Sequence, residues 1–154
     1  MKGKIFTLDE ARRTLPLVRQ ITGDVVSIEH ARLAKAERYK ALYALDEPNH
    51  VSVGEMAELE ASIADMRSQL LVHVRELQEI GCFVKSTLDG LVDWYGEVDG
   101  QIVYWCWRHG EPDIEHYHDL ESGFLGRMKL PAELAAAGSK PDRLADASRC
   151  DPRA

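Results

Sequence analysis

The side chains best suited to chemistry are concentrated in one stretch in the second half of the chain, between Tyr104 and Arg127. It holds two tryptophans, one cysteine, three histidines, two arginines and several carboxylates within some two dozen residues. Imidazole, thiolate and carboxylate groups bind metals and move protons, and guanidinium groups bind anions. We therefore expect any functional site to lie in this stretch.

The clearest metal-binding pattern is the pair His116 and His118. On a strand, residues two apart point to the same side, so both imidazoles can face one divalent ion. Glu111 can supply a third ligand from across the preceding turn. Three nitrogen and oxygen ligands with an open position would suit hydrolytic or oxygen chemistry. The alternative is that the two histidines are unrelated surface residues.

Strand alternation also divides the aromatic segment into two sides. Tyr104, Cys106 and Arg108 are expected on one side, and Trp105, Trp107 and His109 on the other. Arg108 then either contacts a ligand or pairs with a carboxylate, for which Asp93 and Glu111 are the near candidates. We interpret Cys106 as a small buried residue rather than a nucleophile, since an apolar environment raises a thiol pKa. Arg127 follows a glycine-containing loop and can pair with an anion or a carboxylate.

The elements that must position these residues begin with two helices. A capping box at Thr7-Leu8-Asp9-Glu10 predicts a helix from near Leu8 to about Leu45, kinked or restarted at Pro16. After a Pro48-Asn49 turn, Ser52-Val53-Gly54-Glu55 predicts a second capping box and a helix from about Val53 to Ile80, ended by Gly81. A short loop between two long helices predicts an antiparallel hairpin.

The second helix carries a heptad pattern of apolar residues that is typical of a coiled coil. Its seam residues are Met56, Leu59, Ile63, Met66, Leu70, His73, Leu77 and Ile80. His73 is the polar member, and a polar seam residue usually fixes the register of the helices. Alternatively, His73 faces the aromatic segment, if the rest of the protein packs on that end of the hairpin. The seam can also pair with a second copy, which would make a homodimer.

After Gly81 the pattern changes to alternation with a period of two. We predict strands at 82–85, 90–95 and 101–107, separated by the turns Asp89-Gly90 and Asp99-Gly100, and a short fourth strand at 114–118. The fold class is thus α+β, with a long helical hairpin (5–81), a small antiparallel β-meander (82–130) and a disordered tail (131–154) that includes one helical turn near 132–137. Residues 5–130 are expected to form a single domain.

Composition narrows the classes of partner. The formal net charge is −7 and no basic cluster is large, which argues against nucleic-acid binding. No apolar run is long enough to span a membrane, and no secretory signal is evident, so we expect a cytoplasmic protein. The three cysteines, Cys82, Cys106 and Cys150, are far apart and suggest reduced thiols rather than disulfides.

Several of these motifs together resemble a bacterial family known as domain-of-unknown-function family 2203. They are Phe6-Thr7-Leu8-Asp9-Glu10-Ala11 with Leu15-Pro16, Lys85, Gly90-Leu91-Val92-Asp93-Trp94, Cys106-Trp107-Arg108-x-Gly110-Glu111-Pro112 and His118-x4-Gly123-Phe124-x-Gly126-Arg127. The resemblance covers roughly residues 5 to 130. It implies a helical hairpin with a small β element, and it singles out Asp93, Arg108, Glu111, His118 and Arg127. His116 and His109 depart from the family pattern, and no activity or cofactor is implied.

Our sequence-based prediction is a pocket built from Asp93, Arg108, Glu111, His118 and Arg127 and walled by Trp94, Trp105 and Trp107. Mixed charges beside aromatic walls suit a small anionic or zwitterionic ligand, or a divalent metal held by Glu111, His116 and His118. Catalysis there would use His118 to transfer a proton and the arginines to hold an anion. The alternative is a non-enzymatic interaction or dimerisation module, in which the polar cluster is an internal ion-pair network.

Overall fold

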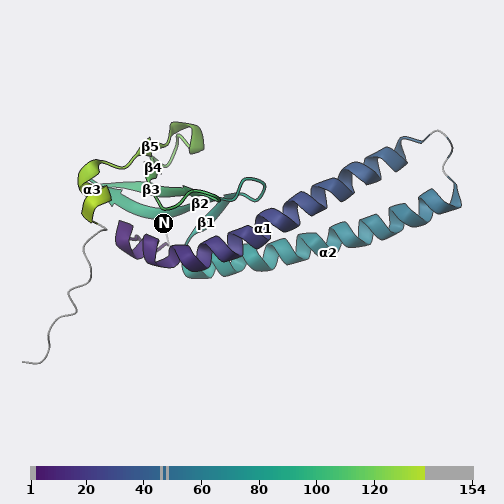
Figure 1. Cartoon of the computed structure of the whole chain (residues 1–154), viewed down its shortest axis with the longest axis horizontal. Helices are drawn as coiled ribbons and strands as arrows, with labels where there is room; N and C mark the ends of the chain where they lie inside the picture. Colours follow the sequence, from purple (N-terminus) through teal and green to yellow (C-terminus); the bar gives the residue numbers. More distant parts are fainter. Residues whose placement is uncertain (1–2, 46, 48, 138–154) are drawn as a thin grey trace, which may run out of the picture.

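The computed structural model describes residues 3–45, 47 and 49–137 and contains a long helical hairpin with a sheet at one end. Helices α1 (Leu8–Tyr43) and α2 (His50–Ile80) pack against each other along their length. A five-stranded antiparallel sheet lies beside the end of the hairpin that holds the start of α1 and the finish of α2 (Figure 1). The opposite end projects away from the sheet. The predicted α+β class is confirmed.

Helix α1 starts as its sequence predicts. The Glu10 amide donates to Thr7 Oγ1 at 3.1 Å, and the Thr7 amide donates to Glu10 Oε2 at 2.9 Å, which completes the capping box. The helix then runs through Pro16 to Tyr43 without a break, so it is not restarted there. Pro16 is exposed, so water can bond the carbonyl that a proline leaves without its helical partner.

Helix α2 begins three residues earlier than predicted. Its N-cap is Asn49, whose side chain accepts from the Ser52 amide at 2.9 Å while Ser52 Oγ accepts from the Asn49 amide at 2.9 Å. Ser52 is therefore the inner partner of a capping box and not its cap, and the predicted start at Val53 is wrong. At the other end Gly81 takes a left-handed φ of 113°, as predicted. Of the predicted Pro48-Asn49 turn, Pro48 lies outside the described residues.

The sheet is a meander in which the strands lie in chain order. Its strands are β1 (Phe83–Ser86), β2 (Leu91–Val98), β3 (Gln101–Arg108), β4 (His116–His118) and β5 (Met128–Lys129). Asp99 and Gly100 have φ values of 50° and 78°, so they form the two-residue turn that sets the β2–β3 register. Strand β5 was not predicted, since its two residues are too few to show a period.

Two short helical segments complete the described chain. A single 3₁₀ turn, η1 (Phe124–Gly126), precedes β5, and helix α3 (Ala132–Ala137) follows it. Helix α3 is the helical turn predicted near 132–137. The rest of the predicted tail, 138–154, lies outside the described residues.

The core lies between the inner face of the sheet and the hairpin. Its largest members are Trp94, Trp105 and Trp107, each with at most 2% of its surface exposed. Their indole N–H groups donate to Thr14 Oγ1, the Phe6 carbonyl and the Glu111 carbonyl respectively, at 2.9–3.0 Å. The prediction that these tryptophans wall the polar pocket is therefore wrong: alternation places them on the face opposite Asp93 and Cys106, where apolar burial stabilises the packing on α1.

Candidate functional site

The outer face of the sheet, which points away from the helices, carries the polar residues. Asp93 on β2 lies opposite Cys106 on β3, and Cys106 lies opposite His116 on β4. Tyr104, two residues before Cys106, lies opposite His118. Because side chains at alternate positions share a face, Asp93, Cys106 and His118 belong to one side of three adjacent strands.

His118 and Asp93 form a buried pair at the centre of this face. His118 Nε2 lies 3.0 Å from Asp93 Oδ2, and only 4% and 3% of the two side chains are exposed. His118 Nδ1 lies 2.6 Å from the Asp119 carbonyl oxygen, which can only accept, so Nδ1 carries a proton and donates. The remaining nitrogen, Nε2, therefore either donates to an ionised Asp93 or accepts a hydrogen bond from a protonated one.

The second oxygen of Asp93, Oδ1, is buried and has no close hydrogen-bond partner among the described residues, and the weak donor beside the carboxyl group is the Cys106 thiol. Burial raises the pKa of the Asp93 carboxyl, and the nearby His118, Cys106 and Lys85 offset this only in part. An unpaired carboxylate oxygen in a dry environment is costly unless a proton or a cation compensates it. This oxygen and His116 Nδ1 are both buried polar atoms of this face that lack a close hydrogen-bond partner among the described residues.

Cys106 completes a group of three potential metal ligands with Asp93 and His118. One ligand atom from each residue lies within 4.8 Å of the others, and all three residues are buried. Burial, and after it the neighbouring Asp93, raise the pKa of the Cys106 thiol to about 12, although Arg127 acts in the opposite direction. The free thiol is therefore protonated and poorly reactive, in line with its predicted burial, and only a bound cation would favour the thiolate.

The separation of His118 and Asp93 can be compared with that of two ligands in a tetrahedral metal site. Metal–nitrogen and metal–oxygen bonds of about 2.0–2.1 Å in a tetrahedron place two ligand atoms about 3.3 Å apart. The separation of His118 Nε2 and Asp93 Oδ2 is 3.0 Å, so a small adjustment would admit an ion between them. The Nδ1–H of a metal-binding histidine typically donates to a backbone carbonyl, as His118 does to Asp119.

A small cavity of about 150 Å³ lies beside this group. Asp93, Cys106 and His118 line its inner part, with Lys85 among the other polar residues. Its remaining lining comprises Leu91, Tyr104, Leu120, Glu121, Gly123 and Phe124, mostly from the segment that follows β4. The cavity thus joins a potential cation site to a wall that is largely apolar.

Glu111 and Arg127 form a second polar pair that adjoins the first group. An Arg127 Nη2 nitrogen contacts Glu111 Oε1, and Glu111 Oε2 accepts from the Arg108 amide at 3.0 Å. Burial by itself would raise the pKa of Glu111, but hydrogen bonds from Arg127 and the Arg108 backbone hold it below its usual value. The guanidinium of Arg127 stacks on Phe124, 4.4 Å from the ring centroid, and influences the Cys106 thiol.

Arg108 does not join either group. It is about half exposed and lies 3.6 Å from Asp89, a carboxylate at the turn before β2. Neither of the side-chain partners suggested from the sequence, Asp93 and Glu111, pairs with its guanidinium in the described part of the chain. The reason is the hairpin register, which places Arg108 opposite Leu91 at the open end of the strands.

The structure therefore separates the predicted site residues into three places. Asp93 and His118 form the buried pair, Glu111 and Arg127 form the adjacent ion pair, and Arg108 lies at the end of β3 beside Asp89. Of the residues predicted to bind a metal, His118 belongs to the three-residue group found among the described residues, whereas Glu111 and His116 do not. His116 shares the face, and its Nδ1 is buried without a hydrogen-bond partner in the described chain.

Two residues of the site were missed by sequence reasoning. Cys106 was assigned only a packing role, although the Asp99-Gly100 turn fixes a register in which it lies opposite Asp93. Lys85 was noted only as part of a motif. A register shift between Val84 and Ser86 leaves Lys85 without a paired residue in β2, and bulges of this kind redirect a side chain. A bulge has no clear sequence signal, so the position of Lys85 needed the structure.

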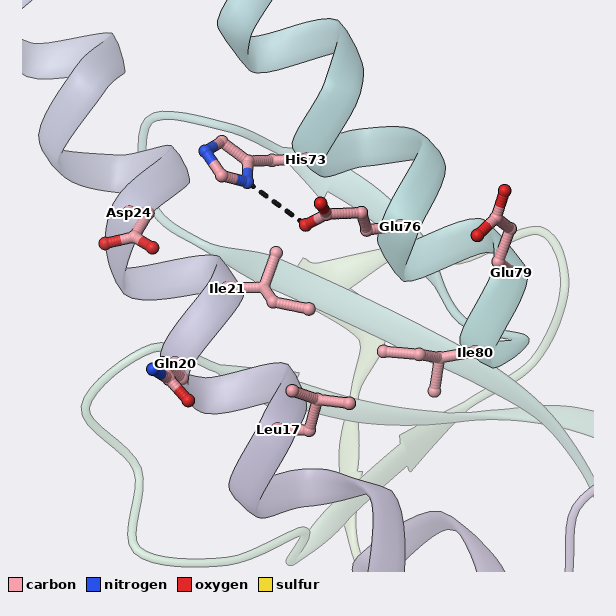
Figure 2. A pocket seen from close by; sticks show the side chains of 8 residues that line it. All are labelled: Leu17, Gln20, Ile21, Asp24, His73, Glu76, Glu79 and Ile80. Atoms are coloured by element: carbon pink, nitrogen blue, oxygen red, sulfur yellow. Dashed lines mark hydrogen bonds and ion pairs between the residues drawn. The ribbon is translucent and has the colours of Figure 1, made fainter.

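His73 lies outside this site, in an open groove between α1 and α2 (Figure 2). His73 Nδ1 lies 3.2 Å from Glu76 Oε2, one turn further along α2. Leu17, Ile21 and Ile80 form the apolar part of the groove, and Asp24 and Glu79 add further carboxylates to its rim. His73 is not among the residues that line the cavity beside Asp93.

Within the residues that the structure describes, no helix has the length and apolar character needed to cross a membrane.

Comparison with known proteins found no matching curated protein and no matching solved structure. One family model matches, that of an uncharacterized conserved protein (DUF2203), over residues 4–130. Since this match spans most of the chain and includes the helical hairpin and the polar face, the protein belongs to the DUF2203 family.

Proposed function

We propose that this protein binds one divalent transition-metal ion, with Zn²⁺ the best match, through Asp93, Cys106 and His118. The observation that carries the proposal is the buried group of Asp93, Cys106 and His118, in which Asp93 Oδ1 lacks a close hydrogen-bond partner among the described residues. A carboxylate buried to this degree needs a compensating charge, and a divalent cation supplies it. The proposal keeps His118 from the predicted metal site and replaces the predicted ligands Glu111 and His116 with Asp93 and Cys106.

The types of ligand atom favour zinc over the common alkaline-earth ions. Calcium and magnesium prefer sets of oxygen ligands, whereas a thiolate and an imidazole suit zinc and related ions. Three protein ligands with a further open position are typical of catalytic rather than structural zinc sites. A zinc ion held in this way supplies Lewis acidity at the open position, so the proposal includes a metal-assisted reaction on a small molecule in the cavity.

The residues around the three ligands have supporting roles. The Asp119 carbonyl fixes the His118 tautomer that leaves Nε2 free for a metal. Arg127 lies near Cys106 and would stabilise its thiolate, while Glu111 holds Arg127 in place. Because metal binding needs a reduced thiol, the proposal also places the protein in a reducing compartment such as the cytoplasm.

Metal titration of the purified full-length protein tests this function. Stripped protein is expected to bind one equivalent of Zn²⁺ in equilibrium dialysis, and Co²⁺ is expected to give a thiolate-to-cobalt absorption band. The band should disappear in Cys106→Ser, and binding should fall more than about a hundredfold in His118→Ala. Two matched controls, Cys82→Ser and His73→Ala, should retain binding. The Cys82 thiol lies in the core and donates to the Leu77 carbonyl, and His73 lies in the groove between the helices.

Two outcomes would contradict the proposal. One is a folded wild-type protein that binds no Zn²⁺ or Co²⁺ at micromolar concentrations. The other is binding that Cys106→Ser and His118→Ala leave intact, which would mean that the metal occupies other residues.

A second candidate function, homodimerisation through the hairpin, is supported by incomplete burial of the seam. Met56, Leu59, Ile63 and Met66 face α1 but are only partly buried, because a single helix covers them. A groove of about 560 Å³ between the helices includes Ile63 and Tyr39. Sedimentation velocity at low concentration tests this candidate: a dimer that Ile63→Glu converts to a folded monomer would support it, and a wild-type monomer would contradict it.

A further inference from the structure

We propose that the cavity beside this site takes a small organic anion, a short-chain carboxylate, held between the metal and the ammonium group of Lys85. The inference rests on the proposed metal function, since the metal would bind one end of the carboxylate. The supporting observations are the position of Lys85, the volume of the cavity and its apolar lining.

Lys85 presents a positive charge to the cavity without an ion-pair partner. Its Nζ lies 4.6 Å from the centroid of the Tyr104 ring and 5.8 Å from that of Phe83. Among the described residues, no carboxylate oxygen lies within 4.0 Å of Nζ. The charge does reach the site, because it contributes to lowering the pKa of Asp93 against the effect of burial. A lysine ammonium group has three donors, and this one lines the cavity without a carboxylate partner among the described residues, so it can donate to an anion there.

The balance of charge around the cavity places the burden on a direct contact. A divalent ion would be neutralised by the Asp93 carboxylate and the Cys106 thiolate, with His118 neutral. Lys85 and Glu121 also line the cavity with opposite charges, and both are exposed, so water screens both. Binding of an anion therefore depends on direct contact with the metal and with the Lys85 ammonium group, and not on a net charge of the cavity.

The size and lining of the cavity select among anions. Its volume of about 150 Å³ corresponds to about five water molecules at about 30 Å³ each. That space matches a carboxylate with a few carbon atoms and would enclose only part of a nucleotide or a sugar phosphate. Leu91, Leu120 and Phe124 provide apolar surface for a hydrocarbon chain, which inorganic phosphate lacks.

The test uses full-length Co²⁺-loaded protein and propanoate as the probe. Propanoate is expected to change the visible cobalt spectrum in a saturable way, whereas propanamide, its neutral counterpart of similar shape, should leave the spectrum unchanged. Lys85→Met should weaken propanoate binding at least about tenfold, the effect expected on losing a charge-assisted contact. Lys85→Arg should recover part of it. Lys129→Met, which removes an exposed lysine from β5, is the matched control and should bind propanoate normally.

Each result has a distinct meaning. If Co²⁺ binds through Cys106 but propanoate has no effect, the carboxylate inference is wrong and the metal function stands. Equal binding by Lys85→Met, or equal binding of propanamide, would likewise overturn it. Tighter binding of inorganic phosphate than of propanoate would replace the carboxylate with an inorganic anion. If Co²⁺ does not bind at all, both proposals fail.

Discussion

Two histidine–carboxylate pairs in this protein have similar distances and very different surroundings. His118 Nε2 lies 3.0 Å from Asp93 on the outer face of the sheet, and His73 Nδ1 lies 3.2 Å from Glu76 in the groove of the hairpin. The first pair joins residues 25 positions apart and is almost fully buried. The second joins neighbours on one helical turn, with 25% of the His73 side chain and 47% of the Glu76 side chain exposed (Figure 2).

Distance alone therefore does not identify a functional pair. Water competes for the groups of the exposed pair, and such pairs contribute little to stability. The buried pair has lost its hydration, so each group depends on its partner and on any cation that binds beside it. The buried pair also has a nearby thiol and a cavity, whereas the exposed pair has further carboxylates and open solvent. The following predictions test this contrast, from the largest effect to the smallest.

The largest effect is expected from removing the buried imidazole. His118→Ala leaves Asp93 buried without its partner, so the free energy of unfolding of the metal-free protein should fall by about 3–5 kcal/mol. His73→Ala, the matched change in the exposed pair, should cost less than about 1 kcal/mol. Urea unfolding at neutral pH measures both. Equal losses in the two variants would show that burial does not distinguish the pairs.

The next largest effect is expected from removing the Arg127 guanidinium group beside Cys106. Arg127→Met should weaken Zn²⁺ binding about tenfold to a hundredfold, the usual cost of losing a group that supports a metal ligand. Arg108→Met removes the same charge from the exposed Asp89 pair and should leave affinity nearly unchanged. Competition with a chromophoric chelator gives the affinities. A similar loss in both variants would indicate a general charge effect rather than contact with the thiolate.

A smaller effect is expected in the pH dependence of stability. Because the pKa of Asp93 is raised in the folded protein, its contribution to stability is fully present below its ordinary pKa of about 3.8 and is lost as pH rises through the folded pKa. The slope from this one proton is at most about 1.4 kcal/mol per pH unit. Asp93→Asn imitates the protonated acid. In this variant the free energy of unfolding of the metal-free protein, measured with urea, should decline less steeply as pH rises. A slope unchanged by Asp93→Asn would mean that other groups cause it.

The smallest effect is expected at the hairpin groove. His73→Leu replaces a polar seam residue with an apolar one beside Ile21 and Ile80, so stability should increase by about 0.5–1 kcal/mol. Thermal unfolding is a sufficient measurement, with Glu76→Gln as a control for loss of the exposed pair. A decrease in stability would show that His73 has a structural role that its exposure conceals.

Local patterns in the sequence predicted most of the elements. The Thr7–Glu10 capping box, the Gly81 cap of α2 and the Asp99-Gly100 turn each depend on residues close in the chain, and each has its predicted effect. Local signals failed where two were in competition: Asn49 and Ser52 can both cap a helix, and the structure uses them together with Asn49 outermost.

The candidate site was only partly predictable. Counting from the Asp99-Gly100 turn places Asp93 opposite Cys106, so the sequence contained this contact even though Cys106 was assigned a packing role. The strand position opposite His118 could not be predicted by such counting, because the segment between β3 and β4 is longer than a tight turn and does not set a register. The β1 bulge that presents Lys85 also lacks a sequence signal.

The sequence by itself determined the helices, the strand alternation and the set of polar residues on one face, since these follow from periodicity and turn chemistry. Only the tertiary structure decided which of them meet. The packing of β4 against β3 buries His118 on Asp93, while the register of the β2–β3 hairpin leaves Arg108 at the end of β3, near Asp89. The physical reason is that burial, which controls the energy of a charged group, is a property of the assembled layers and not of any local segment.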